Sequence, residues 1–351
     1  TPERDSTSFY GQGTWNHSDS LRTVFGLRHT KDEVYSAVTN FYGRSGTDIL
    51  ETDGNKVTGR FVVEKDLDDD TMLYGSFTRG YKPGGSNLTY GREDVVAQIV
   101  VLPTFQEEIV DAFEVGLKTD LADGRVRLNT AAFLYNYEGL QYQATDPEVF
   151  EGGVGNIPDS EIYGAELELS TFLSDSVILD LRMSWLDTEI TANHLALDNV
   201  ESEAATNALL AQGIGLFSND VQVARAGRIQ NVKGNELAKT PSFTGNVALN
   251  WSNDHNWGEL KGTLQYTYRG GFKHRIFNNS QTDLVPNYDV LDIMLGFYPA
   301  SAENQHFEII GKNLFDQDGI NARFTDVFGV GATGDELIAP RQIMLRFVTQ
   351  F

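Results

Sequence analysis

Apolar and polar residues alternate along this chain in many short segments. Within residues 179–185 every second residue is apolar, and Asp180, Arg182 and Ser184 lie between them. With few exceptions, the same pattern holds for residues 243–251 and 260–269, which flank the short segment SNDHNWG. Because successive side chains of a strand point to opposite faces, each segment predicts a strand with one apolar face and one polar face.

Ten further segments show the same pattern, which brings the predicted strands to thirteen: residues 9–15, 21–29, 56–64, 72–81, 110–118, 125–137, 162–171, 288–297, 307–313 and 340–351. Short polar connections such as HSDS, KDLDDDT, TDLADG and FLSDS alternate with long ones at residues 31–55, 82–108, 141–161, 188–240, 270–287 and 317–338. Periplasmic turns and extracellular loops produce this alternation. The sequence therefore predicts an all-β fold, a transmembrane antiparallel β-barrel.

The alternation also assigns side chains to the two faces of the barrel wall. Neighbouring residues must lie on opposite faces, because a shift of one residue exchanges the faces. We expect hydrocarbon to contact Leu181, Leu264 and Phe347. We expect the lumen to contain Arg182, Gln265 and Arg346.

The longest connection, residues 188–240, is rich in Asn, Ala and Gly and has few large apolar residues. We therefore expect it to lack a core of its own and to be exposed and mobile outside the cell. Within it, VESEAATNALLAQ has the composition of a short surface helix. The run Asp68 to Asp70 lacks the glycine and the final glutamate of a calcium loop, so we interpret it as a solvated turn.

Composition narrows the possible functions. The chain has 351 residues, with 34 Gly, 21 Phe, 14 Tyr and no Cys, and its formal net charge is −23. This acidity argues against a nucleic-acid partner, and no apolar run reaches the roughly 18 residues of a membrane helix. No signal peptide is visible. The six His residues show no ligand spacing and no G-x-S-x-G serine occurs, so we expect no metal site, no cofactor and no enzyme activity.

Several longer motifs carry a family resemblance. They are LYGSFTRGYKPGGSN, FQEEIVDAFEVGLKTDLADGRVRLNTAAFLYNYEGLQ, GNIPDSEIYGAELELS, GKNLFDQ and the closing APRQIMLRFVTQF. Together, and in this order, they resemble the barrel of TonB-dependent outer-membrane receptors. The resemblance implies import of a scarce, large solute such as an iron chelate, with energy supplied by TonB. It further implies contact with outer-membrane lipid, lipopolysaccharide and the barrel assembly machinery.

The chain departs from this family in one respect. Family members have an amino-terminal plug domain, preceded by a TonB-contacting box, inside a barrel of about 22 strands. Neither plug nor box is recognisable in this sequence. We therefore expect residues 1–351 to be the carboxy-terminal part of a receptor barrel, with about 13 of its strands.

Candidate ligand contacts lie where predicted strands enter long loops. Polar and aromatic side chains there could hold a solute at the outer mouth. Tyrosines at strand ends also form interfacial girdles, and inward arginines also pair with carboxylates, so each candidate has a structural alternative. The candidates are Arg79, Tyr81, Lys82, Tyr135, Tyr137 and Arg269.

The carboxyl terminus carries a second candidate feature. Leu345, Phe347 and Phe351 share one face of the last predicted strand, and the chain ends on an aromatic residue. Such a strand could pair with the assembly machinery by β-augmentation, so we interpret it as an assembly signal. The alternative is that Phe351 only adds area to the aromatic girdle.

Two other classes of protein fit part of the pattern. A passive pore needs no plug, but it does not explain the receptor motifs. A soluble all-β binding module also has alternating strands, but such a protein would stay monodisperse without detergent.

Overall fold

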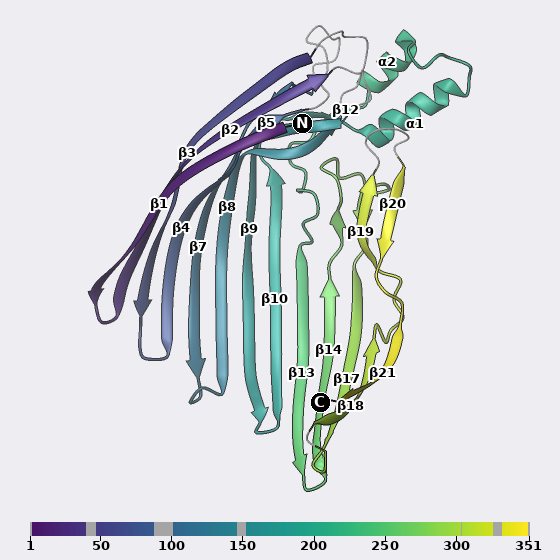
Figure 1. The fold of residues 1–351 in the computed structure, drawn as a ribbon. Helices are drawn as coiled ribbons and strands as arrows, with labels where there is room; N and C mark the ends of the chain where they lie inside the picture. The colour runs from purple at the N-terminus through teal and green to yellow at the C-terminus, as the bar shows by residue number, and fades with distance from the viewer. Residues whose placement is uncertain are drawn as a thin grey trace.

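The fold is a large curved antiparallel sheet with loops and two helices at one end (Figure 1). The computed structural model describes residues 2–39, 47–87, 101–145, 152–302, 304–325 and 332–349. None of the helices in these ranges is long and apolar enough to cross a membrane.

Thirteen strands form the main sheet, and each predicted strand corresponds to one of them. The strands follow one another in the sheet in the same order as in the chain, and each is antiparallel to the next. The strands β1 and β21 form the two edges of the sheet. The strands are β1 (Pro2–Ser18), β2 (Leu21–Thr39), β3 (Thr47–Asp66), β4 (Thr71–Lys82), β7 (Glu108–Leu121), β8 (Val126–Thr145), β9 (Gly152–Ser174), β10 (Val177–Ile190), β13 (Phe243–His255), β14 (Gly258–Arg269), β17 (Tyr288–Pro299), β18 (Gln305–Lys312) and β21 (Gln342–Thr349).

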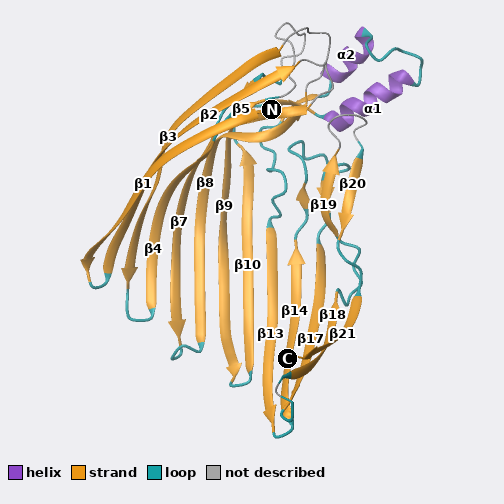
Figure 2. Cartoon of the chain, in the orientation of Figure 1, coloured by secondary structure: helices purple, strands orange, loops and turns teal. Residues whose placement is uncertain are grey.

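The remaining elements lie in the long connections. Four small two-stranded sheets are formed there by β5 (Gly85–Ser86) with β6 (Thr104–Phe105), β11 (Leu195–Leu197) with β12 (Ile229–Asn231), β15 (Phe272–Lys273) with β16 (Leu284–Val285), and β19 (Ile320–Thr325) with β20 (Thr333–Leu337). The helices α1 (Asn199–Leu210) and α2 (Asn219–Ala226) lie in the connection between β10 and β13. Helix α1 confirms the helix predicted from VESEAATNALLAQ. Figure 2 shows both helices at the end of the sheet opposite the tight turns.

Strand register confirms that neighbouring side chains lie on opposite faces. Leu181 is aligned with Leu169 and Val247, whereas Arg182 is aligned with Glu168 and Asn246. The pairs Leu264 with Leu249 and Phe347 with Phe307 are apolar in the same way. Their neighbours form polar pairs: Gln265 is aligned with Asp292, and Arg346 is aligned with Glu308.

Thr188 identifies the polar face as the inner one. It has the same parity as Arg182 in β10, and its hydroxyl accepts a hydrogen bond of 3.0 Å from the backbone N–H of Leu237 in the long connection above the sheet. The opposite face carries aligned aromatic residues, Phe25, Phe61, Phe77 and Phe113, of which the first two are about half exposed. An exposed apolar face of this extent is suited to lipid.

Most buried apolar side chains lie outside this wall. Ile157, Ile190, Ala196, Val232, Leu237 and Ile276 form one buried cluster, against which Leu140, Tyr142 and Phe277 pack. These residues come from the upper β8–β9 hairpin, from the end of β10 and from the connections β10–β13 and β14–β17. We call residues 139–145, 152–157, 190–240 and 272–285 the loop cap. Its core is a hydrophobic cluster of the kind found in soluble domains.

The loop cap corrects two expectations from the sequence. Residues 188–240 were expected to have too few apolar residues to pack, but Ile190, Val232 and Leu237 are each no more than 5% exposed. Residues 31–55 and 141–161 were expected to be loops. In the described part of these ranges, β2 pairs with β3 as far as Thr39 and Thr47, and β8 pairs with β9 as far as Thr145 and Gly152. The strands therefore continue well above the apolar band.

A glycine marks the point where the β8–β9 hairpin leaves the line of the wall. Gly139 has φ +68°, and a Cβ there would lie 2.6 Å from the carbonyl oxygen of Glu107. Only glycine fits both the left-handed conformation and this close approach. Beyond it, Leu140 and Tyr142 pack against the core of the cap. The predicted turn at Asp68 to Asp70 is also present, with the Asp70 N–H donating to the Asp68 carboxylate at 3.0 Å.

The segment between α1 and α2 gives a test of topology. Phe217 there is 83% exposed, whereas Trp257 lies in the tight turn at the other end of the sheet and is half exposed. We expect chymotrypsin added to intact cells to cleave at Phe217 and to leave Trp257 uncut until the outer membrane is permeabilised. Peptide mapping by mass spectrometry measures both sites. Earlier cleavage at Trp257 would mean that the topology is inverted.

Candidate solute-binding site

A hollow of about 460 Å³ lies between the top of the inner wall and the loop cap. The wall contributes Glu108, Tyr137 and Ile162, from β7, β8 and β9. The other lining residues belong to the cap and to the β19–β20 hairpin: Leu140, Gln141, Tyr142, Gln143, Ala144, Ala196, Leu197, Asn199, Leu237, Ala238, Lys239, Thr240, His274, Arg275, Ile276, Phe277, Arg323, Phe324 and Thr325. Aromatic rings and a few charged groups therefore converge on one space, as they do in ligand sites.

Two of the three cations that line this hollow are neutralised within the protein. Arg275 pairs with Asp198 and Asp283, with each shortest contact 2.6 Å long. Arg323 donates from Nε and Nη2 to Asp335 at 2.6 and 2.8 Å. Lys239 is exposed and forms no ion pair within the described ranges of the chain. Its ammonium group is therefore the lining cation that remains for a ligand.

The backbone at Lys239 is held in an unusual conformation. Its φ is +63°, a left-handed value that few residues other than glycine and asparagine adopt. The Lys239 N–H donates to the carbonyl of Lys273 at 2.7 Å, which ties the β10–β13 connection to the β14–β17 connection. Residues held in such conformations cluster at ligand sites. The left-handed backbone thus belongs to the lining cation that forms no ion pair in the part of the chain that the structure describes.

Arg275 forms the junction between the cap loops. Its Nη1 donates to Asp198 at 2.6 Å and to Asn199 at 2.8 Å, and its Nε donates to Asp283 at 2.8 Å. Both carboxylates are fully buried. Asp198 is also the N-cap of α1, where its side chain accepts from the N–H groups of Val200 and Glu201. One guanidinium therefore positions the helical part of one loop on the next loop.

Of the residues predicted to contact ligand, the structure places Tyr137 in the hollow. Tyr135 lies one pleat below on the same inner face and stacks on Phe133, with 4.7 Å between ring centroids. Lys82 is exposed at the end of β4. Ligand contact by these residues stays a prediction.

The other three candidates are engaged within the protein. Arg79 pairs with Asp111, with Nε to Oδ1 2.6 Å, on the face that carries Phe77. Tyr81 donates to the buried carboxylate of Asp32. Arg269 donates to the carbonyls of Ile320 and Asn321 at 2.6 and 2.8 Å, so it supports the start of β19. Arg79 thus pairs with a carboxylate, but on the outward face. Tyr81 and Arg269 bond to a buried carboxylate and to backbone carbonyls.

Sequence patterns did not identify Lys239, His274 or Arg275. They lie in connections without periodic alternation, and their proximity depends on contacts across 50 or more residues, such as the 77 that separate Asp198 and Arg275. The excess of basic and aromatic residues in GGFKHRIFNN was the available signal.

The edge strand β21 carries the predicted assembly signal. Leu345 and Phe347 lie on its outward face and are 82% and 53% exposed. Phe351 lies outside the described residues, and the role of all three as a signal stays a prediction.

Comparison with known proteins identifies the class. The family described as "TonB dependent receptor-like, beta-barrel" matches residues 1–314. The chain therefore belongs to the TonB-dependent receptor β-barrel family, whose members are receptors and transporters of the bacterial outer membrane. This confirms the family, the fold class and the outer-membrane location expected from the sequence.

Particular relatives support the same assignment. The probable TonB-dependent siderophore receptor PiuA of Acinetobacter baumannii is 26% identical over 193 residues, which are 54% of this chain and 24% of that protein. The solved structure of the ferric yersiniabactin uptake receptor FyuA from Yersinia pestis matches with a TM-score of 0.72 at 19% identity, over 100% of this chain and 46% of that one. The structure of PiuA matches with a TM-score of 0.71 at 17% identity, over 99% and 43%. The chain thus spans less than half the length of these relatives.

Proposed function

We propose that this chain is the solute-capturing part of an outer-membrane receptor that imports a large, scarce solute such as an iron chelate. Its main support is the packed loop cap. The cap leaves a hollow above a polar inner wall, lined by aromatic rings and by Lys239, which forms no ion pair among the described residues. The relatives are named as siderophore receptors, which agrees with such a solute. Energy would come through TonB, the partner in the family name, and insertion would require the barrel assembly machinery and outer-membrane lipid.

The geometry favours a receptor over the two rival classes. A passive pore has no use for a cap with its own hydrophobic core over the inner wall. A soluble module would not expose a face with Phe25, Phe61 and Phe113, each about half accessible. We propose no enzyme activity, because the family to which the chain belongs consists of receptors and transporters.

Uptake by cells tests the proposal directly. Strains with and without the gene are supplied with a panel of radiolabelled iron chelates and other large nutrients. We expect one chelate to enter only when the gene and an energised TonB system are both present. Uptake that persists without TonB would favour the passive pore.

Lys239 provides a test of the site itself. Lys239→Asn removes the charge but keeps a residue that tolerates left-handed backbone. Loss of a charged hydrogen bond of about 1.5–3 kcal/mol predicts roughly ten- to hundredfold weaker binding of the chelate that supports uptake. Equilibrium binding to the purified receptor measures it. Lys233→Asn is the matched control, since Lys233 is exposed on the same loop and does not line the hollow. Equal effects of the two changes would remove Lys239 from the site.

A further inference from the structure

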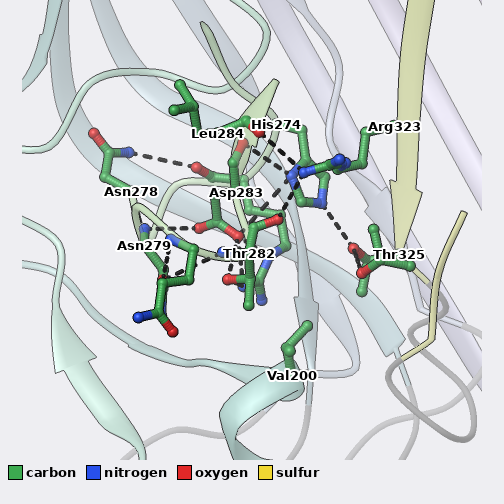
Figure 3. Close-up of polar contacts among 12 residues, drawn as sticks. Val200, His274, Asn278, Asn279, Thr282, Asp283, Leu284, Arg323 and Thr325 are labelled. Atoms are coloured by element: carbon green, nitrogen blue, oxygen red, sulfur yellow. Dashed lines mark hydrogen bonds and ion pairs between the residues drawn. The ribbon is translucent and has the colours of Figure 1, made fainter. Parts of the chain in front are cut away.

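A buried histidine connects two loops at the edge of the hollow. His274 lies in the β14–β17 connection and is 6% exposed. Its Nε2 lies 2.7 Å from the hydroxyl oxygen of Thr325 in β19, and its Nδ1 lies 3.2 Å from the carbonyl oxygen of Asp283. Figure 3 shows the ring between these partners. A carbonyl only accepts, so Nδ1 carries the proton and the neutral Nε2 accepts from Thr325.

The charged groups around His274 already have partners. Asp283 accepts from Arg275 and also from the Asn279 N–H at 3.0 Å, and its nearer carboxylate oxygen is 3.9 Å from His274 Nδ1. Arg323, from β19, is neutralised by Asp335. A proton on His274 would therefore add a third cation beside two guanidinium groups, on a side chain that is largely buried. Burial is the largest effect on this ring and lowers its pKa below the ordinary value.

Among the described residues, other charged groups near the ring leave no free carboxylate beside His274 to stabilise a proton on it. Asp198 pairs with Arg275 at 2.6 Å. Lys239 and Glu108 line the same hollow, and Glu108 accepts from the Gln141 N–H at 2.8 Å. The carboxylates nearest to His274 are thus occupied by arginines.

In the described ranges, three sets of contacts hold the β19–β20 hairpin on the end of β14 and on the cap. Arg269 holds its first residues, and Arg323 Nη1 donates to the carbonyls of Leu284 and Thr282 at 3.0 and 3.3 Å. The third contact is that of Thr325 with His274. Of the groups that make these contacts, the imidazole changes charge between about pH 5 and 8.

We propose that His274 is a pH-sensitive contact of the loop cap, which holds the β19–β20 hairpin in place while neutral and loosens that hairpin when protonated. Because Arg323, Phe324 and Thr325 form one wall of the hollow, loosening would widen access to it. The stability of the packed hairpin should fall as the pH falls, because protonation of His274 favours the loosened state. A histidine with a lower pKa in the packed state contributes stability that is complete above about pH 6.5 and is lost as the pH falls through its packed-state pKa.

Hydrogen–deuterium exchange of the complete receptor in detergent tests this without any solute, so the result is independent of the proposed transport. Amides of residues 320–325 and 333–337 are followed between about pH 7.5 and about pH 5, after correction for intrinsic exchange. We expect their protection to fall below about pH 6.5, by no more than about tenfold per pH unit, the limit for one proton. Constant protection would overturn the proposal.

Two histidine variants separate His274 from general acid effects. His274→Gln, which is neutral at every pH, should make the protection of the hairpin independent of pH. His194→Gln is the matched control, because His194 is partly buried in the cap but bonds to Tyr142, away from the hairpin. It should retain the full pH dependence. A His274→Gln protein that still responds like the wild type would refute the role of this residue.

A titration of the wild-type receptor covers the case in which His274→Gln fails to fold. The ring signal of His274, followed by NMR, should titrate with a midpoint below about pH 6.5, and the loss of protection should level off once the pH is below that midpoint. A midpoint above that value would mean that the ring is stabilised as a cation, and the proposal would fail.

Discussion

Leu181→Arg should destabilise the barrel by about 2 to 4 kcal/mol in a lipid bilayer, whereas Arg182→Leu should change its stability by about 0.5 kcal/mol or less. Leu181 is the middle of the outward apolar series of β10, which runs from Val177 to Trp185. A guanidinium there would replace contact with hydrocarbon. Arg182 lies on the polar inner face, aligned with Glu168 and Asn246, and forms no ion pair within the described ranges.

Reversible urea unfolding in phospholipid vesicles gives both free energies. The two substitutions are at neighbouring positions of β10, and one replaces Leu by Arg while the other replaces Arg by Leu. Each therefore serves as the control for the other. Similar penalties for both would contradict the assignment of the lipid face.

Arg275→Met should have the largest effect on the loop cap. It leaves the buried carboxylates of Asp198 and Asp283 without their cation, and breaking a buried pair in this way costs about 3 to 5 kcal/mol. We expect that loss in the free energy of local opening of residues 190–240 and 272–285, measured by hydrogen exchange, with the wall unaffected.

Two further variants show whether the loss of stability comes from the unpaired carboxylates or from lost packing of the Arg275 side chain. Arg341→Met breaks an exposed pair with Asp316, whose side chains are both about half accessible, and should cost no more than about 1 kcal/mol. Adding Asp198→Asn and Asp283→Asn to Arg275→Met removes the unpaired charges and should restore part of the stability. If the triple variant opened as easily as the single one, packing by the Arg275 side chain would explain the loss instead of charge.

The sequence predicted the wall well because lipid and water impose different residue types on alternate positions. Every strand that crosses the apolar band has this signal, as the pairs of Leu181 and Leu264 show. Above the band both faces meet water or polar loops, so the signal disappears. Residues 31–39 and 47–55 therefore lack the sequence signal of a strand, although they are paired in continuous register.

The site was predicted only in part, for a related reason. Tyr137 could be found because it ends a recognisable strand. Lys239 and Arg275 could not, because their roles depend on which loops pack together. Apolar residues of the cap, such as Ile190, Val232 and Ile276, are spaced without a period, and each is buried by residues distant in the sequence. Composition alone therefore underestimated how well residues 188–240 pack.

The long separations within the loop cap also set an order of events during assembly. Asp198 and Arg275 are 77 residues apart, and His274 and Thr325 are 51 apart, so these contacts close large loops of chain. Contacts of this kind form late, because the entropy of closing the loop must be lost before they stabilise anything. We therefore expect the connections to cross the bilayer as unfolded chain, while β13 to β18 are still inserting. The packed cap would form last, once the wall has brought its parts to the same end.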